Sequence, residues 1–170
     1  MQIDLIPALI DQFRETFESE PAPWVWITDG NPNLAVLGIL RPLPADAAFA
    51  PASHGGKSVA AHVAHLRFSL DLLRQRLDGQ NPSADWQTSF DLQVPPDLTT
   101  DPAVARQAWQ NLQQDLRRAY NDVVSFLEAR RQTPVTEWEP IQVAGFVAMT
   151  AHNAYHLGQI RQLILSMKTL

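Results

Sequence analysis

The sequence predicts an all-α protein in which four long helices form a bundle, within a single domain that spans residues 1–170. Apolar residues recur every three or four positions in four separate stretches, which is the period of one helix face. No stretch shows a clear strand-like alternation, and most prolines and glycines lie between the four periodic stretches. This combination indicates a four-helix bundle of ordinary single-domain length.

The first helix is expected over about residues 2–19, where apolar residues from Ile3 to Phe17 share one face. The following stretch, residues 21–56, contains six prolines, so a continuous helix is excluded there. It also carries many large apolar side chains, which favour a packed irregular loop over a solvated linker. We expect short helical turns within this loop, one of them near residues 44–49.

The second helix, over about residues 58–78, is the clearest element of the sequence. Ser58 is a suitable N-cap, and Gly79 is a suitable stop. The apolar residues alternate steps of four and three, which is typical of a bundle seam. These seam residues are Val59, Val63, Leu66, Leu70, Leu73 and Leu77. A second long irregular loop is expected over residues 79–100.

The third helix is expected over about residues 101–131, with Pro102 at its first position and Asp101 or Thr100 as its cap. The fourth helix is expected over about residues 142–167 and is apolar nearly all round. Such a helix is typically buried on several sides, either centrally or against another subunit.

The composition excludes several classes of function. The chain contains no cysteine, which removes disulfides, iron–sulfur clusters and thiolate zinc sites and fits a cytoplasmic location. The formal net charge of −5 argues against a nucleic-acid partner. No run of 18 apolar residues indicates a membrane span, and the first residues lack the pattern of a signal peptide.

Histidines are the chemically most informative residues of this chain. They are His54, His62, His65, His152 and His156. Two of them are three residues apart on the second expected helix, and two are four apart on the fourth, so each pair shares a helix face. Helical rotation puts the second pair on the same stripe as Met149 and Ile160, which predicts that both imidazoles point inward.

Two buried imidazoles are costly unless their nitrogens are satisfied, and one divalent metal ion can bind both members of an i,i+4 pair. A third ligand would come from the second helix. His62 lies closer than His65 to the centre of the apolar seam around the helix axis, so helical rotation favours His62. Three neutral histidines suit zinc, nickel, iron or cobalt, with coordination positions left open. The alternative is that these histidines are satisfied core residues without metal. His54, in a Ser-His-Gly-Gly loop, is expected to be exposed.

Two segments resemble the DinB/YfiT-like superfamily, whose members are interpreted as metalloenzymes. The segment 56–66, Gly-Lys-Ser-Val-Ala-Ala-His-Val-Ala-His-Leu, is similar to the family's pattern on its second helix. The segment 152–160, His-Asn-Ala-Tyr-His-Leu-Gly-Gln-Ile, is similar to the family's His-x-x-x-His-x-Gly-Gln helix. The order of the expected helices also agrees with this family, so the resemblance covers most of the chain.

The resemblance implies a four-helix bundle with one divalent metal, zinc or nickel ahead of iron or cobalt, bound by His65, His152 and His156. Alignment to the family pattern thus selects His65, whereas rotation alone selects His62, which stays as the alternative ligand or as a group that contacts a ligand or the substrate. Family members are commonly homodimers, which would suit the apolar surface of the fourth helix.

The family includes thiol-dependent transferases, among them bacillithiol transferases and the mycothiol-dependent maleylpyruvate isomerase. The resemblance therefore implies a metal-dependent enzyme acting on a small molecule, with S-transfer from a low-molecular-weight thiol as the first hypothesis. A metal-dependent hydrolase is the second, although Asp71, Glu137 and Glu139 are not well placed in the sequence as a general base. The third is a non-catalytic, stress-associated bundle whose histidines belong to the core.

Several other residues near these motifs carry expectations of their own. Tyr155 is expected to have a packing role. For Gln159 two roles are equally expected: a hydrogen bond near the site, or an ordinary buried amide. We expect Arg161 to form a salt bridge and Arg67 to form a surface ion pair. Tryptophans should mostly anchor the core or loops. The loop after the second helix, which contains Trp86 and Phe90, is expected to cover the site.

Overall fold

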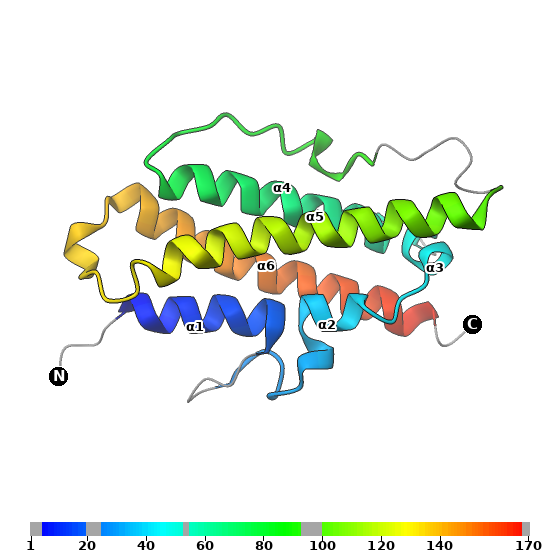
Figure 1. Cartoon of the computed structure of the whole chain (residues 1–170), viewed down its shortest axis with the longest axis horizontal. Coiled ribbons are helices and arrows are strands. Elements are labelled where there is room, and N and C mark those ends of the chain that lie inside the picture. The colour runs from blue at the N-terminus through cyan, green and yellow to red at the C-terminus, as the bar shows by residue number, and fades with distance from the viewer. Residues whose placement is uncertain (1–4, 20–24, 53–54, 93–99, 168–170) are drawn as a thin grey trace.

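The computed structural model describes residues 5–19, 25–52, 55–92 and 100–167, and every regular element in these ranges is helical. Four long α-helices dominate: α1 (Leu5–Glu18), α4 (Val59–Leu77), α5 (Pro102–Glu128) and α6 (Pro140–Met167). They are arranged side by side along one long axis (Figure 1). The expected all-α bundle is confirmed, and the observed helix ends differ from the expected ones by a few residues.

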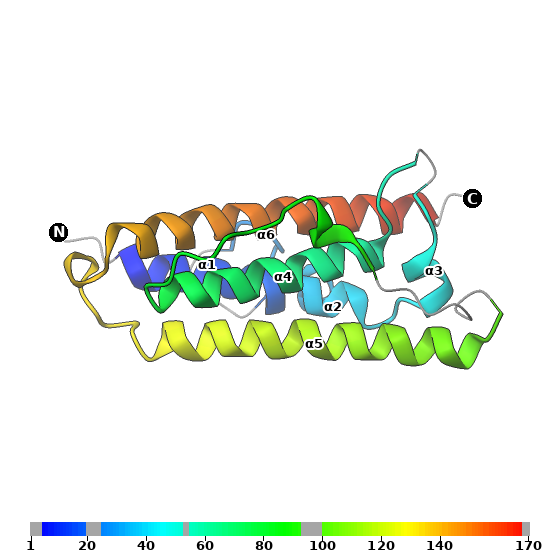
Figure 2. The same cartoon turned by 90° about the horizontal axis from the view of Figure 1, so that it is seen from above.

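The order of the helices explains the long connection between α4 and α5. Helices α1 and α6 run in one direction, and α4 and α5 both run in the other (Figures 1 and 2). Two successive helices that are parallel need a connection that returns along the bundle. The described part of this connection, residues 79–92, lies along α4 and contains the short 3₁₀ helix η2 (Thr88–Phe90).

The loop between α1 and α4 also folds as expected, into short helical pieces. It contains η1 (Pro32–Leu34), α2 (Val36–Leu40) and α3 (Ala45–Phe49), and α3 coincides with the helical turn expected near residues 44–49. Helix α2 continues the line of α1 along the bundle (Figure 1). A third 3₁₀ helix, η3 (Val135–Glu137), lies between α5 and α6.

The seam expected on the second helix forms the centre of the core. All six of its residues on α4 are 1% exposed or less: Val59, Val63, Leu66, Leu70, Leu73 and Leu77. Phe17 of α1 stacks on Tyr120 of α5 with ring centroids 4.8 Å apart, and Phe13 lies 6.0 Å from Phe146 of α6. The Ser58 hydroxyl accepts a hydrogen bond from the Ala61 N–H, which confirms the expected N-cap of α4.

A buried carboxylate fixes the first loop to α1. Glu15 is only 1% exposed, and its oxygens accept hydrogen bonds from the backbone N–H groups of Trp26, Ile27 and Thr28 at 2.6–3.1 Å. Burial alone would raise the pKa of Glu15, but these backbone hydrogen bonds outweigh it and lower the pKa. Glu15 is therefore an ionised anchor for a segment that has no regular structure.

Arg161 of α6 holds the same loop from the opposite side, so the salt bridge expected for it is wrong. Its guanidinium donates to the backbone carbonyls of Leu34 at 2.9 Å and Ile27 at 3.0 Å. No ion pair of Arg161 is found among the residues that the structure describes. The loop between α1 and α2 is thus attached to α1 through Glu15 and to α6 through Arg161.

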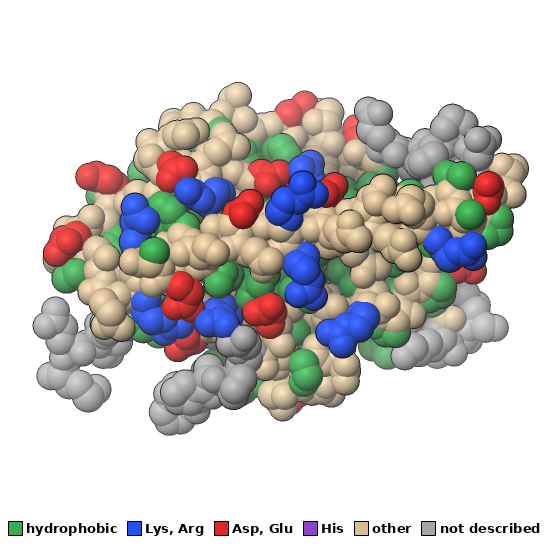
Figure 3. Space-filling model, viewed as in Figure 1, with side chains coloured by type: hydrophobic (Ala, Val, Ile, Leu, Met, Phe, Trp, Pro, Cys, Tyr) green, Lys and Arg blue, Asp and Glu red, His purple; other side chains and the backbone are tan. Residues whose placement is uncertain are grey.

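Helix α6 is less buried than its composition suggested. It packs against α4 and α1 on one side, but Ile141, Val147, Tyr155 and Leu165 are exposed on the other. By contrast, the face with α5 in front carries charged side chains of both signs, and none of the described histidines is visible there (Figure 3). In the described part of the chain, no helix has both the length and the apolar character needed to cross a membrane.

Replacement of Glu15 tests its role as an anchor. Glu15→Gln removes the charge and one acceptor from the three backbone N–H groups, and we expect the free energy of unfolding to fall by about 2 kcal/mol. The exposed Glu139→Gln is the matched control and should change it little. Urea denaturation at neutral pH measures both values, and equal stability of the two variants would contradict this role.

Candidate metal centre

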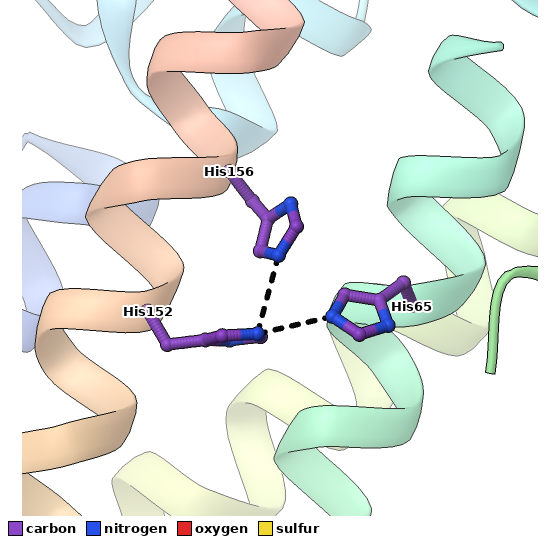
Figure 4. A group of neighbouring side chains, drawn as sticks. All are labelled: His65, His152 and His156. Carbon is purple, nitrogen blue, oxygen red and sulfur yellow. Dashed lines mark hydrogen bonds between the residues drawn. The ribbon is translucent and has the colours of Figure 1, made fainter. Parts of the chain in front are cut away.

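Three histidines from two helices meet between α4 and α6. His65 lies in the first half of α4, and His152 and His156 lie one turn apart on α6; all three point toward a common centre (Figure 4). The Nε2 atom of His152 is 3.0 Å from Nε2 of His65 and 3.2 Å from Nε2 of His156. One ligand atom from each residue lies within 4.8 Å of the other two.

The environment of these rings keeps them neutral. His65 and His156 are 3% and 4% exposed. Burial, together with the neighbouring imidazoles, lowers the pKa of His65 to about 4 and that of His156 to about 3. Burial also lowers the pKa of His152. Neutral imidazoles with available lone pairs are the form in which histidine binds metals.

His62, the residue favoured by helical rotation, is also buried, but it contacts His156 and is not part of the three-histidine cluster. Its Nδ1 atom lies 3.1 Å from Nδ1 of His156, which is not the nitrogen of that ring that lies beside His152. Burial lowers its pKa too. Residues three apart are separated by about 60° around a helix, so both His62 and His65 can face α6. His54 lies outside the described residues.

The connection after α4 covers the cluster with aromatic rings, as the sequence suggested. Phe90 stacks on His65 with centroids 3.9 Å apart and planes inclined by 5°. Trp86 lies 5.9 Å from the rings of both His65 and His152 and is 40% exposed. We call residues 86–90 the aromatic cover. Within it, the Ser89 hydroxyl lies 2.7 Å from Nδ1 of His65, a contact that no sequence pattern signalled.

The other residues near the motifs have mixed outcomes. Tyr155 is not packed as expected: it is 61% exposed and touches only the rim of the site, with its ring 5.0 Å from His156. Gln159 is exposed, so it is neither a buried amide nor a group of the cluster. Arg67 forms the expected ion pair with Asp71, at 3.0 Å.

The tryptophans divide between anchors and surface. Trp109 and Trp138 are buried, as expected of core anchors, whereas Trp26 is 74% exposed and is not an anchor. Trp24 lies outside the described residues. The exposed Trp26 ring is attached to a backbone that Glu15 holds, so its position is fixed by the backbone and not by packing.

The arrangement of nitrogens fits a metal ion. Tetrahedral ligands at the zinc–nitrogen distance of about 2.0–2.1 Å lie about 3.3 Å from one another, close to the 3.0 and 3.2 Å that separate His152 from the other two nitrogens. One proton on His152 Nε2 can serve only one of its two neighbouring nitrogens, whereas a cation can accept all three lone pairs. No carboxylate joins the cluster in the described ranges, which leaves the remaining coordination positions to water or substrate.

Comparison with models of known protein families identifies the family of this chain. The family model of the DinB superfamily matches residues 35–160, which include α2 to α5, the cover and most of α6. The chain therefore belongs to the DinB superfamily. No curated protein and no solved structure shows significant similarity to it.

The lowered pKa values give the metal-free protein a defined pH dependence. Between about pH 6.5 and pH 4 the unfolded chain binds protons at His156 that the folded chain does not, so stability falls as the pH falls. The slope contributed by this residue approaches about 1.4 kcal/mol per pH unit. His156→Gln cannot titrate and should remove that contribution, as measured by urea denaturation with chelator at several pH values. If the free energy of unfolding of His156→Gln depends on pH as steeply as that of the wild type, the lowered pKa of His156 is contradicted.

Proposed function

We propose that His65, His152 and His156 hold one divalent transition metal ion and that the protein is a metal-dependent enzyme acting on a small molecule. The observation that carries this proposal is the convergence of three neutral imidazoles, with His65 and His156 buried, His152 partly buried, and no carboxylate among them in the described residues. Imidazole ligands suit zinc, nickel, iron or cobalt, and the family resemblance puts zinc or nickel first. Membership of the DinB superfamily supports the same assignment.

Transfer of a low-molecular-weight thiol is the chemistry that fits this site best. A bound metal would lower the pKa of a thiol and so supply a thiolate nucleophile at neutral pH. The chain itself has no cysteine, so the sulfur has to come from a separate molecule. His65 and His156 are already deprotonated at neutral pH, so no proton has to leave them before they bind. The aromatic cover shields the His65 ring from bulk water through the stacked Phe90.

Hydrolysis is the second candidate and is less well supported. A hydrolase needs a general base within reach of the attacking water. Among the described residues no Asp or Glu oxygen lies in the histidine cluster, and Asp71 is engaged by Arg67 elsewhere on α4. Glu137, in η3, and Glu139 are exposed just before α6 begins. These placements favour transfer over hydrolysis.

The alternative to an enzyme is a non-catalytic helical bundle whose histidines belong to the core. It is favoured by the hydrogen bonds that the histidines already make to one another, because such contacts satisfy core imidazoles in part. In that case His152→Leu should stabilise the metal-free protein, because Nδ1 of His152 is buried without a partner in the described structure. In the metalloenzyme, the same variant should lose the bound metal.

The metal content of untagged protein tests the proposal. We expect about one equivalent of a transition metal by mass spectrometry in the wild type. His156→Ala should lose it, and the exposed Gln159→Ala, one turn further along α6, should keep it. Absence of metal in the wild type after incubation with zinc and with nickel would overturn the metalloenzyme proposal.

The metal-loaded protein is then assayed for S-transfer from glutathione, bacillithiol or mycothiol to 1-chloro-2,4-dinitrobenzene. The thiolate sulfur forms a bond to the ring carbon, chloride leaves, and the thiol proton goes to the buffer. We expect turnover that requires the metal and is lost in His65→Ala. Ester hydrolysis without any S-transfer would instead support the hydrolase.

We also propose that the chain forms a homodimer through the exposed side of α6. Eight uncharged residues form a continuous exposed stripe: Ile141, Ala144, Ala148, Ala151, Tyr155, Gly158, Gln162 and Leu165. Arg161 is the only charged residue of α6. No atom would contact a Cβ at Gly158, so nothing in the described structure requires a helix-destabilising glycine there.

The stripe is complementary to itself in an antiparallel arrangement. A two-fold axis near its centre would set Ala151 opposite Tyr155 of the second copy and Ala148 opposite Gly158. The apolar ends, Ile141 and Leu165, would then meet. Small residues opposite one another allow close approach of two helices, and a self-complementary patch is what a two-fold dimer requires.

Sedimentation of the purified protein tests this dimer. The wild type should sediment as a dimer at micromolar concentration. Ala151→Arg should be monomeric, because the two-fold axis brings two like charges into an apolar contact. Gln107→Arg, at an exposed position of α5, is the matched control and should remain dimeric. A monomeric wild type, or a dimeric Ala151→Arg, would overturn the assignment.

A further inference from the structure

The Ser89 hydroxyl connects the aromatic cover to a ligand of the proposed metal. Ser89 is buried, and its Oγ atom lies 2.7 Å from the backbone carbonyl oxygen of Trp86 and 2.7 Å from Nδ1 of His65. The first contact closes the turn of η2 within the cover. The second crosses from the loop to α4.

The protons of these two hydrogen bonds can be assigned from the chemistry of the groups. A carbonyl oxygen only accepts, so the single hydroxyl proton of Ser89 is donated to Trp86. The oxygen of Ser89 must then accept the proton of His65 Nδ1. Since His65 is neutral, its other nitrogen, Nε2, carries a lone pair and no proton. That nitrogen is the one that faces His152.

We propose that Ser89 is a positioning residue of the metal centre, which fixes His65 in the tautomer whose Nε2 lone pair points at the metal. This inference rests on the proposed function for the ligand role of His65, although the tautomer itself can be observed without metal. Acceptors that bind the second nitrogen of a ligating histidine fix its tautomer and orientation in many metal sites. Here the acceptor comes from the short 3₁₀ helix η2, in the connection between α4 and α5.

The cover also fixes the plane of the same ring. Phe90 lies parallel to His65 at 3.9 Å, so rotation of the imidazole about its Cβ–Cγ bond would collide with the phenyl ring. Ser89 and Phe90 are adjacent and thereby define both the orientation and the protonation of one ligand. The pair His62–His156 is different, because either Nδ1 atom can be the donor and the geometry leaves the tautomer open.

The test observes the tautomer and the metal affinity separately. Long-range ¹⁵N–¹H NMR of metal-free protein at about pH 8, where histidines are neutral, should show His65 protonated at Nδ1 in the wild type. Ser89→Ala should lose this preference and bind zinc about tenfold more weakly in competition with a chelator. Ser89→Thr keeps the hydroxyl and should restore both properties. The exposed Ser83→Ala, in the same connection, is the matched control.

The outcomes separate this inference from the proposed function. A wild type with the His65 proton on Nε2, or a Ser89→Ala protein with unchanged tautomer and zinc affinity, would overturn the role of Ser89. A wild type that shows the Nδ1–H tautomer but binds no zinc would overturn the metal site and leave the hydrogen bond intact. If Ser89→Ala disturbs the fold, the wild type and Ser89→Thr are compared by NMR alone. Both should show His65 protonated at Nδ1, and a His65 proton on Nε2 in either protein would contradict the role of Ser89.

Discussion

The structure depends on keeping several imidazole rings uncharged in a place from which water is largely excluded. Protonation of His65 or His156 would put a cation beside its neighbours in a dry contact, and this is why their pKa values lie so far below the ordinary one. The histidines can therefore offer lone pairs throughout the neutral range. Their convergence requires α4 and α6 to stay at a fixed distance, which the apolar seam of α4 maintains.

Away from the histidines, the structure keeps two side chains charged next to the loop between α1 and α2. Glu15 is buried yet ionised, because backbone N–H groups replace its hydration. Arg161 is satisfied by carbonyl oxygens in the same way. Both use the unpaired backbone groups of an irregular loop, which needs partners as much as they do. One part of α6 thus gathers neutral imidazole rings, and Arg161 further along the same helix fixes a loop through its cationic side chain.

Much of this architecture could be predicted from the sequence, because helical periodicity reports which side of a helix is buried. The α4 seam, the α3 turn and the convergence of His152 with His156 follow from spacing alone. Spacing favoured His62 over His65, whereas the structure groups His65 with the two histidines of α6, because rotation about α4 does not reveal where α6 crosses it. Ser89 and the carbonyl partners of Arg161 had no signal either, because these contacts join a loop to a distant helix.

The parallel course of α4 and α5 has a consequence for what their connection can do. Helix α4 is 19 residues long, about 28 Å, so the chain needs only about nine extended residues to return along it. The connection is more than twice that long and passes directly over the histidines. Closure of the bundle therefore does not need the full length of this connection, and the additional length is what lets it place Ser89 and Phe90 against His65.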